Sequence, residues 1–64
     1  MKTKDIQELG TDEIRQRIST EQENLRQMEF RHAVGTLNEP IQIRTSRRLI
    51  ARLKTVLNQK EQAA

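Results

Sequence analysis

The chain has 64 residues and a net charge of +3; 33% of its residues are hydrophobic, 33% are charged, and one is aromatic. A chain this short buries only about 60% of its unfolded surface, which predicts one domain over residues 1–64 that needs a partner for part of its stability. Because the chain has no cysteine, it has no disulfide or thiolate metal site, and its composition suits a reducing cytosol. No apolar run approaches the roughly 18 residues that a membrane span requires.

The first segment, residues 4–9, predicts one short helical turn with Ile6 and Leu9 as its apolar contacts. Gly10 suits the left-handed backbone that often follows a helix end. The start at Met1 lacks the apolar stretch of a secretion signal.

A long helix is predicted over residues 12–34. Thr11 reads as its N-cap, and the acidic pair 12–13 meets the positive end of the helix dipole. Gly35 can end this helix. Its apolar stripe consists of Ile14, Ile18, Leu25 and Met28, with Glu21 and His32 on the same side. Phe30 and Val34 project from the opposite side, where they either cover the loop or the first segment, or touch a partner.

Residues 36–39 are predicted to form a connection of the length found between antiparallel helices. Pro40 suits the first position of a second helix over residues 40–60, with Asn38 or Glu39 as its cap. One buried face is predicted from Leu49, Ile50, Leu53, Val56 and Leu57, with Ile43 as a further apolar residue. The fold class is therefore all-α: an antiparallel two-helix hairpin with a short N-terminal helical segment.

Charge is divided unevenly along the chain. Residues 1–37 hold six Lys or Arg and seven Asp or Glu, whereas residues 38–64 hold six Lys or Arg and two Glu. At about 100° per residue, five cations of the second helix fall on the side opposite its apolar face. They are Arg44, Arg47, Arg48, Arg52 and Lys54.

This basic face can be a solvated surface, as most helical charge runs are. A solvated face, however, usually pairs acids with bases four residues apart, and no acid occurs between Arg44 and Lys60. An anionic partner explains such uncompensated charge better, and arginine grips phosphate with two hydrogen bonds. Thr55 is a candidate phosphate donor on the same helix. Lys2 and Lys4 form a smaller basic site, either an RNA contact or solubility charges.

No catalytic arrangement accompanies this surface. Metal binding and acid–base chemistry need groups that converge on one point, and His32 is better explained as a partly packed helix residue. Glu21 is expected to reach across the helix seam to a cation such as Lys54. Thr45 and Ser46 have no local base, and no glycine-rich phosphate loop is present. The sequence predicts a protein that is not an enzyme and needs no cofactor.

The string Arg47-Arg48-Leu49-Ile50-Ala51-Arg52-Leu53-Lys54-Thr55-Val56-Leu57 strongly resembles the second-helix motif of a bacterial ribosomal-protein family, number twenty-nine in the large-subunit series. Ile43-Arg44, the turn residues Ala33, Gly35 and Leu37, and the opening Met1-Lys2-Thr3-Lys4-Asp5-Ile6 with Asp12-Glu13 also fit. The resemblance spans nearly the whole chain. One departure is that the family commonly has Asn-Leu-Arg late in the first helix, where this chain has Gln27-Met28-Glu29, so that Glu29 replaces a cation.

The resemblance implies a cytoplasmic, non-enzymatic constituent of the large ribosomal subunit that binds 23S rRNA. It further implies a position near the peptide exit tunnel beside ribosomal protein twenty-three, where chaperones and targeting factors dock.

Two other classes of protein are less compatible with the sequence. A helical interaction module that dimerises into a four-helix bundle is the alternative, because a two-helix hairpin leaves apolar surface exposed. A DNA-binding helix-turn-helix suits the chain poorly, because its two helices are too long.

Overall fold

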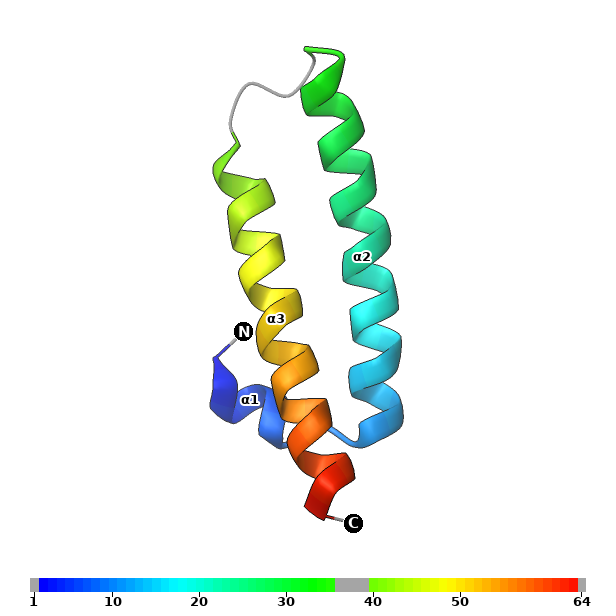
Figure 1. The fold of residues 1–64 in the computed structure, drawn as a ribbon, viewed down its shortest axis with the longest axis vertical. Coiled ribbons are helices and arrows are strands. Elements are labelled where there is room, and N and C mark those ends of the chain that lie inside the picture. The colour runs from blue at the N-terminus through cyan, green and yellow to red at the C-terminus, as the bar shows by residue number, and fades with distance from the viewer. Residues whose placement is uncertain (1, 36–39, 64) are drawn as a thin grey trace.

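The computed structural model describes residues 2–35 and 40–63, and these residues form three helices. They are α1 (Thr3–Gln7), α2 (Thr11–Ala33) and α3 (Ile41–Ala63). Helices α2 and α3 lie side by side and run in opposite directions, while α1 lies beside the C-terminal half of α3, on the other side of α3 from α2 (Figure 1). The predicted all-α hairpin with a short N-terminal helix is therefore confirmed.

Helix α1 is held by one buried side chain. Ile6 is fully buried, and Leu9, just beyond the helix, packs partly against the same cluster, as predicted. The helix starts one residue before the predicted segment and ends two residues earlier. Its first turn is closed by the Asp5 carboxylate, which accepts the backbone N–H of Lys2 at 3.4 Å.

The start of α2 differs from the prediction. Gly10 has φ −73° and ψ 160°, so it is extended rather than left-handed. Its carbonyl accepts the N–H of Ile14 at 3.0 Å, which makes Gly10 the capping residue and Thr11 the first residue of the helix. The acids at 12 and 13 lie in the first turn, where the positive end of the helix dipole favours them.

Glycine does end α2, as predicted. Gly35 has φ +81°, a conformation that costs most other residues about 1 kcal/mol or more. Val34 donates its N–H to the Phe30 carbonyl and Gly35 donates to that of His32, which closes the last turn. The predicted connection 36–39, with Asn38 or Glu39 as cap, lies outside the described residues.

Helix α3 begins directly after Pro40, one residue later than predicted. The Pro40 carbonyl accepts the N–H groups of Ile43 at 3.1 Å and Arg44 at 3.2 Å, so proline stands just before the first helical residue. The helix continues to Ala63 rather than ending near residue 60, because no helix-breaking residue intervenes.

The core is concentrated where all three helices meet. Its buried members are Ile6, Ile14, Ile18, Leu53 and Val56, with Leu9, Leu49 and Leu57 packed at the edge. Farther along the hairpin only two helices face each other; there Ile43 and Ile50 are buried, but Leu25 and Met28 are only half-buried. The molecule is an elongated body of 44 × 17 × 14 Å. No described helix is both long and apolar enough to cross a membrane.

Candidate nucleic-acid interface

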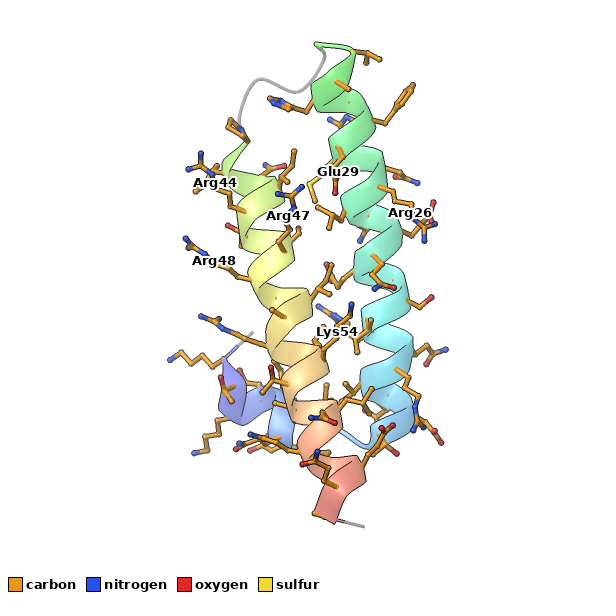
Figure 2. All side chains as sticks on the ribbon, viewed as in Figure 1. Arg26, Glu29, Arg44, Arg47, Arg48 and Lys54 are labelled. Atoms are coloured by element: carbon orange, nitrogen blue, oxygen red, sulfur yellow. The ribbon has the colours of Figure 1, made fainter. Side chains whose placement is uncertain are left out.

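The cations of α3 form two rows rather than one uniform face. Arg44 and Arg48 point away from α2, whereas Arg47 and Lys54 point toward it (Figure 2). Arg52 follows Arg48 by one helical step of four residues and so continues the outward side. We call Arg44, Arg48 and Arg52 the outer row, and Arg47 with Lys54 the seam row.

The seam row is partly neutralised by α2. The guanidinium Nη2 of Arg47 lies 3.7 Å from Oε2 of Glu29, and the two side chains are 62% and 46% exposed. The prediction that the basic face lacks a counter-charge is therefore wrong for Arg47. The acid lies on the neighbouring helix, where the sequence of α3 alone does not reveal it. Glu29 follows half-buried Leu25 by four residues, and this spacing indicates that it lies along the seam.

The predicted contact between Glu21 and Lys54 is replaced by another. Glu21 instead forms an ion pair on its own helix, with its Oε1 3.3 Å from the Nε of Arg17. The Glu21 side chain is 15% exposed, so it lies along the seam as its place on the apolar stripe implied. A partner four residues away reaches it without crossing the hairpin.

Arg44 and Arg48 of the outer row have no such compensation from any residue that the structure describes. Among the described residues, no ion pair reaches either of them, and both are exposed. Like charges four residues apart on a helix are destabilising by about 0.2–0.5 kcal/mol per pair. The helix therefore carries a small electrostatic cost along its outward side that an anion would relieve.

On helix α2, by contrast, several arginines have acidic partners. Its arginines at 15, 17 and 26 each pair with an acid: Arg15 with Asp12 and, across the hairpin, with Glu61; Arg17 with Glu21; and Arg26 with Glu23. Mixed signs of this kind are typical of a solvated face. The contrast separates Arg44 and Arg48 from the charged surface of α2.

Helix α1 lies beside the C-terminal end of the outer row. A groove between α1 and α3 is lined by Thr3 and Gln7 on one side and by Arg52 and Thr55 on the other. This places the helix that follows Lys2 and includes Lys4 beside the C-terminal part of the row. Both lysines are exposed.

Thr55 lies in this groove, but its hydroxyl group already makes a hydrogen bond within the helix. The hydroxyl group donates to the Ala51 carbonyl at 2.9 Å, a hydrogen bond within α3. To donate to a phosphate, it would have to give up this bond. Thr45 makes the same kind of bond to Ile41.

The described residues hold no group of three or more potential ligands that could bind a metal ion. His32 lies exposed beside a depression at the seam that Glu29, Ala33 and Arg47 also line.

Comparison with known proteins gives one consistent result. A family model described as "Ribosomal L29 protein" matches residues 4–60. A large ribosomal subunit protein uL29 from Amoebophilus asiaticus is 45% identical over 60 residues, which cover 94% of this chain and 97% of that protein. The uL29 proteins of Staphylococcus aureus and Desulfatibacillum aliphaticivorans are 46% and 39% identical, over 95% and 97% of this chain and 88% and 100% of their own lengths.

Proposed function

The chain belongs to the ribosomal L29 protein family, and we propose that it binds 23S rRNA through the outer row of α3. As a member of this family it is a structural, non-enzymatic component of the large ribosomal subunit, and it is cytoplasmic as part of the ribosome. Ribosomal RNA and neighbouring ribosomal proteins are its partners.

One observation carries the proposed surface: Arg44 and Arg48 have no acidic partner in the described chain, while three arginines of α2 do. Three guanidinium groups spaced by four residues extend over roughly 12 Å of helix. Cations in this arrangement neutralise neighbouring phosphates and release their counterions. Backbone contacts recognise the shape of folded RNA rather than its base sequence.

We further propose that the protein lies near the peptide exit tunnel, beside ribosomal protein twenty-three, where chaperones and targeting factors dock. The resemblance of the Arg47–Leu57 string to the family motif supports this placement. Crosslinking from the chain in intact large subunits tests it: ribosomal protein twenty-three should be among the crosslinked neighbours.

The rRNA surface is tested by the double variant Arg44→Gln/Arg48→Gln, which keeps helix-forming side chains but removes two outward charges. Because each lost phosphate contact lowers the salt slope of log K by about 0.7–0.9, the slope should fall by about 1.5. Equilibrium binding to 23S rRNA at several salt concentrations measures this change.

The matched control is Arg15→Gln/Arg17→Gln, which lowers the net charge equally on α2. Its surface ion pairs contribute at most about 1 kcal/mol each, so the fold should persist. Equal slopes for the two double variants would show that net charge alone governs binding, and the outer row would lose its assignment.

A further inference from the structure

The only aromatic side chain points into solvent. Phe30 lies on α2 but is 68% exposed, and Val34, one helical step further, is 55% exposed. Both face away from the core, which rules out the reading in which Phe30 covers α1, since α1 packs at the other end of the hairpin (Figure 1). Single exposed apolar residues are common. An exposed aromatic ring in a chain with no other aromatic residue is a more specific feature.

Cations flank this ring. A shallow depression on α2 is lined by Phe30, Gln27 and two arginines, Arg26 and Arg31. Figure 2 shows Arg26 on the side of α2 away from α3. The nearby acid Glu23 pairs with Arg26 at 3.0 Å, and both of these side chains are largely exposed. A surface pair of this kind contributes at most about 1 kcal/mol, so a phosphate can replace Glu23 as the partner of Arg26 at little cost.

We propose that Phe30 is a stacking platform for an unpaired rRNA base, with Arg26 and Arg31 beside it for the flanking phosphates. An aromatic face stacks on any base, and arginine contacts either the phosphate or the base plane. The two cations at the ring favour a polyanion over an apolar protein partner. The Gln27 amide can donate to or accept from the edge of the base.

This inference rests on the proposed function and adds a second contact on the opposite flank. Arg44 and Arg48 of the outer row point away from α2, and Arg26, which lines the same depression as Phe30, lies on the side of α2 away from α3. A chain that binds with both flanks lies between two rRNA segments and holds them apart by the width of the hairpin.

The test uses Phe30→Trp in the full chain. The sequence contains no tryptophan or tyrosine, so the introduced indole is the sole fluorescent reporter of its kind. Its emission should be quenched when 23S rRNA binds, because a stacked base contacts the indole. Gln16→Trp is the control: Gln16 is exposed on the same side of α2, about four turns away, and the emission of that variant should stay unchanged.

Affinity gives the second readout. Phe30→Leu keeps the apolar contact but removes the aromatic face, so it should bind 23S rRNA about 5-fold or more weakly. The salt slope should stay the same, because no charge is lost. Phe30→Trp should bind as tightly as the unsubstituted chain.

Several outcomes would overturn the platform. Unquenched emission from a Phe30→Trp chain that binds rRNA normally would exclude stacking. A Phe30→Leu chain that binds rRNA with full affinity would also exclude stacking. If that variant were nevertheless missing from assembled large subunits, Phe30 would contact a protein neighbour instead. If Arg44→Gln/Arg48→Gln binds normally while the Phe30→Trp emission is quenched, the outer row fails and the platform stands. Failure of the unsubstituted chain to bind rRNA would contradict both the outer-row proposal and the platform proposal.

Discussion

At the scale of single residues, the arginines of α3 differ in what they face. Arg44 and Arg48 point outward, while Arg47 points to Glu29 across the seam (Figure 2). Glu29 places a negative charge at the seam, where it partly neutralises Arg47. The proposed rRNA surface is therefore narrower than the number of cations on α3 suggests.

Replacing Glu29 with glutamine should release Arg47 for phosphate. An exposed ion pair contributes about 0.2–1 kcal/mol, so Glu29→Gln should tighten 23S rRNA binding by up to about 5-fold. A binding titration at fixed salt measures this. In an Arg47→Gln background the same change should have less effect, since the partner is gone.

Glu13→Gln is the charge-matched control, because Glu13 lies exposed at the far end of α2. Equal tightening by both substitutions, or an effect of Glu29→Gln that persists without Arg47, would mean that general charge rather than this pair sets the affinity.

At the scale of elements, α1 depends on the hairpin for its existence. Five residues are far too few for an isolated helix. Its one buried residue, Ile6, reaches the cluster that contains Ile14 and Leu53. Packing rather than helix propensity therefore holds α1 beside α3. The same packing places the helix that carries Lys4 beside the part of α3 that carries Arg52.

Truncating this anchor should destabilise the whole molecule. Ile6→Ala should lower the free energy of unfolding by about 2–4 kcal/mol, because it leaves a cavity among the three helices. Gln7→Ala, at an exposed residue of α1, should change the free energy of unfolding by no more than about 0.5 kcal/mol. Urea unfolding followed by circular dichroism gives both values. An Ile6→Ala chain as stable as the unsubstituted one would show that α1 does not dock in solution.

At the scale of the whole molecule, burial is uneven. Three helices share the core at one end, and two helices face each other at the other. The large exposed apolar residues of the described chain are Phe30, Val34 and Ile41, all near the hairpin turn. A four-helix bundle needs an apolar stripe along the length of both long helices. The exposed apolar surface is confined to one end, which favours the ribosomal function over the dimerising module.

The isolated chain should therefore sediment as a monomer at micromolar concentration. A stable interface buries about 800 Å² on each partner, more than a few residues at one end supply. Sedimentation velocity over a range of concentrations checks this. A stable dimer at the lowest concentration would restore the four-helix bundle as an explanation.

Much of the fold could be predicted from local patterns. The spacing of Ile14 and Ile18, and of Leu53 and Val56, gives the two buried faces, because helical periodicity is a property of consecutive residues. The end of α2 at Gly35 could also be predicted, because the positive φ found there is a local property of the backbone that glycine adopts without strain. Gly10 shows the limit. The same residue type is extended there and caps the next helix, since its φ depends on how α1 and α2 join.

The sequence alone determined the family, the helical hairpin and the concentration of positive charge on α3, because each of these follows from the order and spacing of the residues. The tertiary structure decided which cations are compensated. Whether Glu21 meets Arg17 or Lys54, and whether Glu29 meets Arg47, depends on the distance between two helices. Ion pairs across a seam form only where side chains from separate parts of the chain come within a few ångströms.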